Sequence, residues 1–300
     1  MDDHSTLLRP NRSQLSVPAI DPRKIDKALA SAADALFLDL EDSVDSARKE
    51  EARQFAVESL LRDGWGNRDR AVRINPVESR WCLQDVIAVM EAAGAAVDRL
   101  VVPKVQTAGD VHFLDRLLSG LESDLARDCP VLLEVQIEDP LGLHNLEAIA
   151  SASSRISHLT FGQGDFAAAA GMPAVDIGVD DEWDAAVSGD RWLFPRQQIV
   201  LTAVRHDLRA LNGSYANFRD HDGFRAYCRM SRALGFTGTW CIHPDQIAIA
   251  NDVWTPTADE IARAQAIIDA LENAGAIGHG GTMIDEASVR MARRTLNAGS

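Results

Sequence analysis

The sequence has few cysteines, a deficit of basic residues and no long hydrophobic run. Four cysteines are scattered through 300 residues with no C-x-x-C pair, which argues against a zinc site and suits a reducing compartment. No apolar stretch approaches the roughly 18 residues that a membrane-spanning helix needs. The first residues, MDDHSTLLRPNRS, are acidic and polar and do not resemble a signal peptide. We therefore expect a cytoplasmic protein with no membrane partner.

The charge balance excludes a second class of partner. Lysine and arginine number 30 against 45 aspartates and glutamates, for a formal net charge of -15. Such a surface repels nucleic acid and anionic membranes, so we expect neither as a partner. A local basic pocket for a phosphorylated ligand is still compatible with this average. At 46% hydrophobic, the chain is able to bury one large core.

Short apolar, β-branched runs recur along the chain, each followed by a stretch of helical periodicity. Eight strands are predicted in this way, at residues 14–19, 35–41, 71–76, 99–105, 131–138, 158–165, 208–213 and 238–244. Alternating strands and helices indicate a parallel α/β architecture, and eight such units close into a (β/α)8 TIM barrel. A doubly wound open sheet is the structural alternative. Asp21 before Pro22 is a predicted helix N-cap.

Two segments depart from the simple repeat. Residues 172–190 are acidic and loop-like, and they form an insertion after the sixth strand. The sequence predicts a barrel domain over residues 1–250 and a C-terminal helical lid over residues 251–300. In that lid two helices flank a glycine-rich hinge, Gly278 to Gly281. Such an arrangement is typical of a lid over a barrel mouth or an arm that reaches a neighbouring subunit.

Polar residues follow the apolar runs at the points where the strands are predicted to end. The stretch FLDLEDSV, residues 37–44, leads from a buried strand directly into carboxylates. Because the carboxyl ends of all barrel strands face one opening, we expect these side chains to gather there. The residues concerned are Glu41, Asp42, Arg73, Asn75, Lys104, Glu138, Asp139, Asp165 and His243.

The types of residue at these strand ends suggest a chemistry. Glu138 and Asp165 follow adjacent strands and suit a Mg²⁺ site whose other positions are filled by water or substrate oxygens. A zinc site would need more histidine or cysteine. Arg73 offers a fixed fork for a carboxylate or an enolate oxygen. We therefore expect metal-assisted stabilisation of an oxyanion on a small carboxylic acid.

Structural roles compete with each of these interpretations. Arg73 and Asp42 are also able to form an ordinary salt bridge, and Glu138 is positioned to cap the helix that follows it. Glu134 lies four residues earlier on the same strand and is a rival metal ligand, deeper in the barrel. His243 is expected to hold its loop by hydrogen bonds rather than to act in catalysis.

At these residues the chain resembles a known family. The segments RSQLSVPA, DLEDSV, VRINP, VPKV, IEDPLGL, FGQGDFAAAAGM, GTWCIHPDQI and GTMIDEASVRMA occur in order over almost the whole length. Together they resemble the HpcH/HpaI aldolase and citrate lyase β-subunit superfamily, within its branch of malyl-CoA and citramalyl-CoA lyases. One departure is Asp139, where the family often has threonine.

The resemblance implies a (β/α)8 barrel that uses Mg²⁺, with Mn²⁺ as a possible substitute. It implies cleavage or formation of a carbon–carbon bond in a 3-hydroxyacyl-CoA such as malyl-CoA, methylmalyl-CoA or citramalyl-CoA. The products are a short acyl-CoA and a 2-oxo acid, glyoxylate or pyruvate. A homotrimer or homohexamer is also implied. A malyl-CoA thioesterase, a class II hydroxy-oxo-acid aldolase and a citrate lyase β subunit are the alternatives.

The resemblance also implies roles for individual residues. Glu138 and Asp165 match the metal ligands, and Arg73 matches the arginine that binds the oxo acid and the developing enolate. Asp285 matches an acid/base aspartate that serves its own barrel or that of a neighbouring subunit.

Glu41 and Asp42 match the second-strand acids that order the arginine and the metal-bound waters. The candidates for contacts with the CoA ester or its carboxylate are Gly164, Lys104, Arg12 and Arg23.

Overall fold

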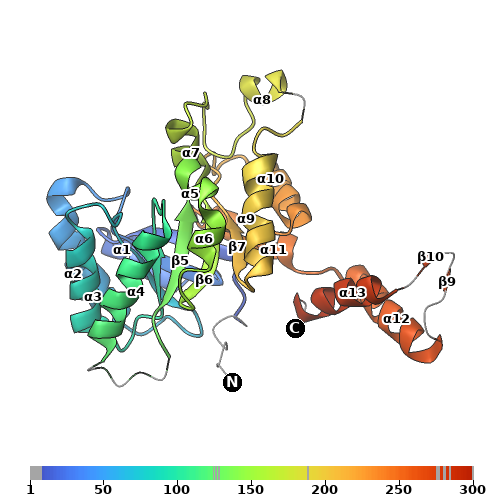
Figure 1. Cartoon of the computed structure of the whole chain (residues 1–300), viewed down its shortest axis with the longest axis horizontal. Coiled ribbons are helices and arrows are strands. Elements are labelled where there is room, and N and C mark those ends of the chain that lie inside the picture. The colour runs from blue at the N-terminus through green and yellow to red at the C-terminus, as the bar shows by residue number, and fades with distance from the viewer. Residues whose placement is uncertain are drawn as a thin grey trace. The chain divides into compact units, whose positions relative to one another are not determined.

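The computed structural model describes residues 9–123, 125, 127, 129–187, 189–274, 278–279, 282–283 and 285–298. The chain divides into two compact units, Met1–Ala250 and Asn251–Ser300 (Figure 1).

The first unit is built on a closed barrel of eight parallel strands (Figure 1). Each strand pairs with the next along the chain, and β1 pairs with β8 to complete the circle. The predicted (β/α)8 barrel is confirmed, and the open doubly wound sheet is excluded. The strands are β1 (Ser13–Pro18), β2 (Ala35–Asp39), β3 (Arg70–Arg73), β4 (Arg99–Val102), β5 (Leu132–Ile137), β6 (Ile156–Phe161), β7 (Arg209–Asn212) and β8 (Gly238–Cys241).

Helices connect the strands on the outside of the barrel, and α2, α3 and α4 run alongside one another (Figure 1). Asp21 caps α1 as predicted, because its side chain accepts hydrogen bonds from the backbone N–H groups of Arg23 and Lys24. The helices of this unit are α1 (Pro22–Leu29), the 3₁₀ helix η2 (Ser46–Arg48), α2 (Lys49–Leu60), α3 (Cys82–Ala93), α4 (Ala108–Glu122), α5 (Pro140–His144), α6 (Leu146–Ala150), α7 (Gln163–Ala169), α8 (Glu182–Ala186), α9 (Leu193–Arg205) and α10 (His221–Leu234). α11 (Asp245–Trp254) crosses into the second unit.

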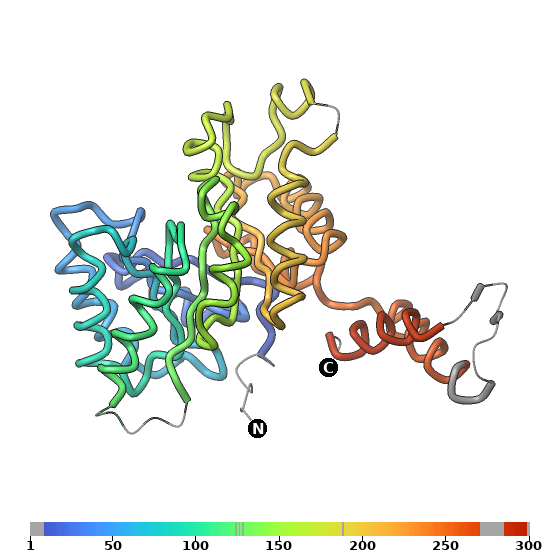
Figure 2. Tube along the Cα trace, in the orientation of Figure 1, coloured from blue at the N-terminus to red at the C-terminus, as the bar shows by residue number. Residues whose placement is uncertain are grey.

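The acidic insertion is not entirely a loop. Figure 2 traces it from α7 through the short helix α8 to α9. α8 forms because Asp181 and Asp184 make a capping box around its first turn. The Asp181 side chain accepts from the N–H of Trp183 at 2.8 Å, and Asp184 accepts from the N–H of Asp181 at 2.9 Å. Reciprocal bonds of this kind satisfy donors that a helix start leaves free.

The strands end earlier than the apolar pattern predicts. β2 ends at Asp39 and β4 at Val102, whereas the sequence suggested residues 41 and 105. The apolar residues Leu40 and Ile74, which follow β2 and β3, each still donate one backbone hydrogen bond to the neighbouring strand, at 2.9 and 3.1 Å. Glu41, Lys104 and Glu138 therefore lie in the loops directly after their strands.

The barrel interior has an apolar layer and a polar one. Phe37, Ala71, Val101, Leu211 and Trp240, from five different strands, form a buried apolar cluster. A second group of buried polar side chains stands on the N-terminal halves of the strands. We call this group the polar floor, and it consists of Gln14, Arg99, Glu134 and His158.

The polar floor is closely hydrogen-bonded. Arg99 donates from Nη2 to the Gln14 side-chain oxygen at 3.0 Å, and its Nη1 lies 3.1 Å from the His158 ring. Gln14 in turn donates to both carboxylate oxygens of Glu134, at 2.9 and 2.8 Å. Burial lowers the pKa of His158 well below its usual value, and Arg99 lowers it further. His158 is therefore neutral, and the floor is a structural layer of the barrel.

The second unit contains α12 (Ala258–Ala274) and α13 (Glu286–Ala298), which contact each other. Between them β9 (Gly278–His279) and β10 (Thr282–Met283) form a short antiparallel pair. The predicted hinge at Gly278 to Gly281 lies partly outside the described residues. Over the described ranges, none of the helices is both long and apolar enough to cross a membrane.

Candidate active site

Arg73, the last residue of β3, stands at the centre of the strand-end cluster. It pairs in register with Asp39 of β2, and its Nε and Nη2 each donate to an Asp39 oxygen at 2.7 Å. Its Nη1 lies 3.1 Å from Glu41 Oε2. Burial opposes the ionisation of Asp39, but Arg73 holds the pKa of that carboxyl below its usual range. Two-point pairing of this kind fixes the guanidinium in its plane.

Asp39 is a site residue that the sequence analysis missed. The alternation of side chains along a strand offered a signal, because Asp39 is two residues from Phe37 and shares its inward face. The family resemblance implied this role for Glu41 and Asp42. Glu41 does contact Arg73, whereas the Asp42 side chain is 59% exposed and approaches Lys104 at 3.5 Å. The proposed salt bridge between Arg73 and Asp42 is thus replaced by one with Asp39.

Lys104 lies among the carboxylates of the site. Its Nζ is 2.6 Å from Glu41 Oε1 and 3.7 Å from Asp165 Oδ1. Its backbone has a φ of 55°, in the left-handed region that a residue with a side chain seldom adopts. In this conformation its N–H donates to Glu138 Oε1 at 2.7 Å. Lys104 therefore contacts four of the predicted site residues, Glu41, Asp42, Glu138 and Asp165.

Glu138 is a buried carboxylate with few donors. It is 2% exposed, and it accepts from the Lys104 N–H and from the side-chain amide of Gln136. Burial raises the pKa of Glu138 well above its usual value, and the negative charges of Asp165 and Glu41 raise it further. A Cβ at Gly162 would overlap the Glu138 side chain, so only glycine allows this close approach.

Glu138 is not the cap of the following helix. Asp139 caps α5 instead, because its Oδ1 accepts from the N–H groups of Leu141 at 2.7 Å and Gly142 at 3.0 Å. The alternative structural role predicted for Glu138 is therefore wrong. Asp139 points its charge toward the helix, which explains how a second acid is tolerated next to Glu138.

The residues present fit a hard divalent cation. Glu138 and Asp165 supply carboxylate oxygens, and Asp165 stands in the first turn of α7 with its side chain 44% exposed. Among the described residues, no three His, Cys, Asp or Glu side chains form a metal-binding group. Two carboxylates suit Mg²⁺, which usually keeps several waters or substrate oxygens. A cation here would also offset the mutual repulsion that raises the pKa of Glu138.

A cavity of about 150 Å³ opens at these strand ends. Arg73, Asp42, Gly164 and Asp165 line it together with the apolar side chains of Phe161, Ile177, Trp240 and Ile242. A Cβ at Gly164 would stand 2.7 Å from Ile177 Cδ1, so glycine keeps this wall open. This volume has room for several water molecules or a small acid.

Two predicted site residues of the first unit, Arg12 and Arg23, are not among the residues that line this cavity. Arg12 precedes β1 at the opposite, N-terminal end of the barrel and donates to Asp34 at 2.7 Å, so its position does not support a contact with the substrate. Arg23 lies exposed in the first turn of α1, which follows the C-terminal end of β1. Asp285 belongs to the second unit, where its carboxylate accepts from the N–H and hydroxyl of Ser288 at 2.9 Å.

Hydrogen bonds also bear on two other predictions, Glu134 as a rival metal ligand and His243 as a residue that holds its loop. Glu134 is fully buried and accepts from Gln14, from Thr160 at 2.7 Å and from Trp240 at 2.9 Å. Its oxygens are committed to the polar floor, and it is not a metal ligand. His243 Nδ1 accepts from the N–H of Asp245 at 3.3 Å, in agreement with the predicted role in holding its loop by hydrogen bonds, and its ring stacks on Phe218 with centroids 4.5 Å apart.

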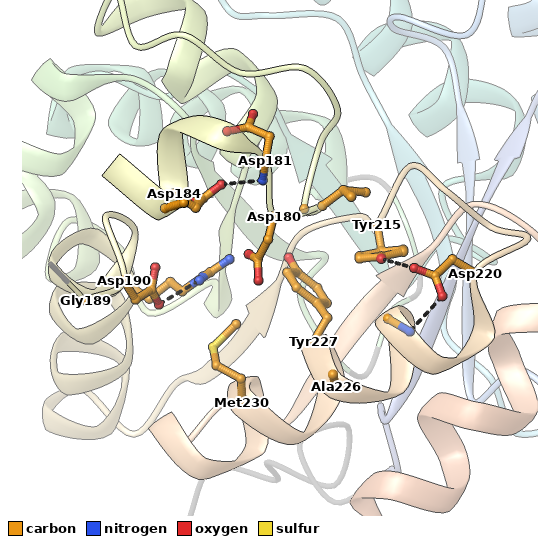
Figure 3. Close-up of a pocket in the computed structure, with 15 residues that line it drawn as sticks. Asp180, Asp181, Asp184, Gly189, Asp190, Tyr215, Asp220, Ala226, Tyr227 and Met230 are labelled. Carbon is orange, nitrogen blue, oxygen red and sulfur yellow. Dashed lines mark hydrogen bonds and ion pairs between the residues drawn. The ribbon is translucent and has the colours of Figure 1, made fainter. Parts of the chain in front are cut away.

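A larger cavity of about 790 Å³ lies beside the acidic insertion. Figure 3 shows Asp180, Asp184 and Asp190 on one side of it and Tyr215 and Tyr227 on the other. Burial raises the pKa of Asp180, and Asp184 and Asp190 raise it further. Arg196 also lines the cavity and pairs with Asp190 at 3.0 Å. Five aspartates against this one arginine leave the lining acidic, which disfavours the polyanionic part of a CoA ester.

A family model described as HpcH/HpaI aldolase/citrate lyase matches residues 12–244. An L-malyl-CoA/beta-methylmalyl-CoA lyase from Cereibacter sphaeroides is 38% identical over 300 residues, covering 95% of this chain and 93% of the relative. A (3S)-malyl-CoA thioesterase from the same species is 34% identical and covers 96% and 94%.

A solved structure is similar over nearly the whole chain. It is the CitE protein from Mycobacterium tuberculosis in complex with magnesium, acetoacetate and coenzyme A. The TM-score is 0.80 at 26% identity, and the match covers 97% of this chain and 99% of the CitE chain.

Proposed function

We propose that this chain, which belongs to the HpcH/HpaI aldolase/citrate lyase family, is a magnesium-dependent carbon–carbon lyase. Its substrates are 3-hydroxyacyl-CoA esters such as malyl-CoA and β-methylmalyl-CoA. It cleaves them to a short acyl-CoA and a 2-oxo acid, or joins the two in the reverse direction. The lyase relatives cover almost the entire chain, and the similar CitE structure contains magnesium, a small oxo acid and CoA.

One observation carries the proposal. A buried carboxylate whose ionisation is opposed, Glu138, lies in the same strand-end cluster as Asp165 and a fixed guanidinium, Arg73. In a purely structural ion-pair network each buried charge usually has a partner of opposite sign. Here burial and two neighbouring carboxylates oppose the ionisation of Glu138, and a bound cation would favour it. The adjoining cavity has room for a small acid.

Glu138 and Asp165 would hold the ion, which supplies Lewis-acid stabilisation of the substrate oxygens. Arg73 binds the oxo-acid half and stabilises the negative charge that develops on oxygen as the bond breaks. Asp39 keeps the guanidinium in one plane, so no reorganisation is needed when that charge appears. Glu41 joins Arg73 to Lys104 and orders the positive side of the site.

Asp285 is the proposed acid/base group of the reaction. In the cleavage direction the carboxylate of Asp285 accepts the proton of the substrate hydroxyl group, the carbon–carbon bond breaks, and its electrons form the enolate of the acyl-CoA. Asp285 then gives a proton to the enolate carbon, or removes it in the condensation direction. Hydrogen bonds from Ser288 lower the pKa of Asp285, so at neutral pH the carboxylate form, which starts the condensation, predominates.

The CoA contact, the assembly and the location of the protein are proposed from the family resemblance. We expect Arg23 rather than Arg12 to contact the CoA part, because Arg23 follows the strand end that faces the site. A homotrimer or a homohexamer is the expected assembly, and light scattering after size-exclusion chromatography measures it. A cytoplasmic location agrees with four free cysteines, three of them buried.

Product analysis tests the lyase activity. Purified protein is given malyl-CoA and citramalyl-CoA stereoisomers with Mg²⁺, and again with EDTA. Acetyl-CoA with glyoxylate or pyruvate is expected in Mg²⁺ and lost both in EDTA and in Asp165→Ala. A protein that binds Mg²⁺ but cleaves none of these esters would contradict the proposal.

A thioesterase is the second candidate, because one relative at 34% identity has that name. It requires water to attack the thioester carbonyl while the carbon–carbon bond stays intact. The same assay separates the two functions, since free CoA with intact malate or citramalate identifies the thioesterase.

A further inference from the structure

The guanidinium of Arg73 is held by more than its carboxylates. Asp39 and Glu41 contact its nitrogen edge, and bonds in the plane of the group do not stop that plane from tilting. The tilt is limited by what lies against its faces. Arg73 Cζ stands 5.5 Å from the ring centroid of Trp240 and 5.7 Å from that of Phe37.

An aromatic face has a specific advantage at this position. It attracts a cation through its quadrupole without adding a formal negative charge. A third carboxylate against Arg73 would neutralise the charge that the reaction needs on the substrate side. Trp240 and Phe37 pack on each other with centroids 4.6 Å apart, so together they form a continuous apolar support for the guanidinium.

The ring of Trp240 is itself fixed from below. Its Nε1–H, the single polar group of the side chain, donates to Glu134 Oε1 at 2.9 Å. Glu134 is immobilised in turn by Gln14 of the polar floor and by Thr160, which both donate to it. A phenylalanine at position 240 would fill similar space but would lack this anchor. Trp240 also lines the cavity at the strand ends.

We propose that Trp240, oriented by Glu134, is a positioning residue that sets the plane of Arg73 beneath the substrate. The chain of contacts runs from the floor through Glu134 and Trp240 to Arg73, and it ends in the cavity. This inference rests on the proposed lyase function for its catalytic consequence. Its structural consequence, the immobilisation of Arg73, stands independently of that function.

Thr160→Val provides a matched control. Thr160 donates to the same Glu134 oxygen at 2.7 Å, whereas the hydrogen bonds and ion pairs of Arg73 go to Asp39 and Glu41. If Trp240 served only to satisfy Glu134, losing either donor would have the same consequence. A difference between the variants in catalysis, at equal residual stability, therefore isolates the role of the ring.

The test compares Trp240→Leu, Trp240→Phe and Thr160→Val in the full chain with Mg²⁺, at a temperature where each is folded. Trp240→Leu is expected to lower kcat on the order of 10-fold, the size of a partly buried cation–π contact, with KM for malyl-CoA changed by less than about 3-fold. Trp240→Phe keeps a ring and retains more activity. Thr160→Val is expected to stay within about 2-fold of wild type in kcat despite a lower Tm.

A second measurement does not need turnover. Hydrogen exchange of the Arg73 Nε–H is followed by NMR, with the resonance assigned by its absence in Arg73→Lys. Faster exchange in Trp240→Leu but not in Thr160→Val supports the proposal. Equal exchange and equal kcat in these two variants would overturn it, whereas an inactive wild type with fast exchange only in Trp240→Leu would overturn the lyase assignment alone.

Discussion

Glu134 and Glu138 lie four residues apart along one strand and its loop, and both are buried, at 0% and 2% exposure. Their surroundings differ in kind. Glu134 accepts hydrogen bonds from Gln14, Thr160 and Trp240, and Arg99 Nε stands 3.5 Å away. Glu138 accepts from one backbone N–H and one amide, next to two further carboxylates whose charges raise its pKa.

The contrast separates a structural layer from a functional one. The polar floor pairs the charge of Arg99 with the carboxylates of Glu134 and Asp69, at 3.5 and 3.4 Å, although the Arg99 Nε–H has no hydrogen-bond partner among the described residues. The mouth around Glu138 holds several acids together with Arg73 and Lys104, and one of its residues has a left-handed backbone. Unsatisfied charge and local strain are features that folding alone does not favour, and they gather where a ligand is to be bound.

The largest effect on activity is expected from a substitution at the mouth of the barrel. Glu138→Gln removes the charge that a cation would pair with, and we expect lyase activity to fall by about 10³-fold, since several kcal/mol of charge stabilisation depend on it. The variant should fold as well as wild type in EDTA, because the lost charge was unfavourable. Steady-state kinetics and thermal melts measure both, and unchanged activity would remove Glu138 from the site.

The second largest effect is a loss of stability from a substitution in the polar floor. Glu134→Gln places an amide NH₂ group against the Gln14 amide and Arg99, and we expect a loss of about 3 kcal/mol in the free energy of unfolding. Activity per folded molecule should change by less than about 3-fold, because the amide carbonyl still accepts from Trp240. Urea denaturation gives the stability. A stable variant without activity would reverse the roles assigned to the two glutamates.

The third effect concerns Asp39, which pairs with Arg73 at the mouth of the barrel. Asp39→Asn weakens two charge-assisted bonds to Arg73 and is expected to lower kcat/KM roughly 30-fold. Asp42→Asn, whose side chain is mostly exposed, should stay within about 3-fold. Parallel kinetics on the two variants measure the difference. Equal losses would restore the sequence-based assignment of Asp42.

The smallest effect is a pH dependence. The folded-state pKa of Glu138 is raised by burial, so folding favours the protonated acid. Stability from this group is present below the usual pKa of glutamate and is lost as pH rises through the raised value. In EDTA, wild type should therefore lose stability relative to Glu138→Gln as pH rises. Melts at several pH values measure this trend, and a difference that is independent of pH would argue against the raised pKa.

The sequence was sufficient to predict the barrel and the clustering of polar residues at its mouth. Eight apolar runs identified eight strands, and their ends located Arg73, Glu138 and Asp165 near one another. The strand ends were placed too late, because apolar composition continues briefly after the ladder stops. Arg12 was misplaced because it precedes its strand, and that position belongs to the opposite end of the barrel.

Other features depend on three-dimensional contacts that composition does not reveal. Asp39 looked like part of a buried strand, and only the register of β2 with β3 brings it opposite Arg73. The left-handed backbone of Lys104 has no signature in its residue type. The saturation of Glu134 requires donors from β1, β6 and β8, whose convergence follows from barrel closure alone.

Isothermal titration of Mg²⁺ in the presence of pyruvate tests the central claim most directly, with wild type, Glu138→Gln and Glu134→Gln compared at one pH. The account predicts one binding event in wild type and in folded Glu134→Gln, and none in Glu138→Gln. Magnesium binding that survives in Glu138→Gln, or that disappears in folded Glu134→Gln, would contradict it.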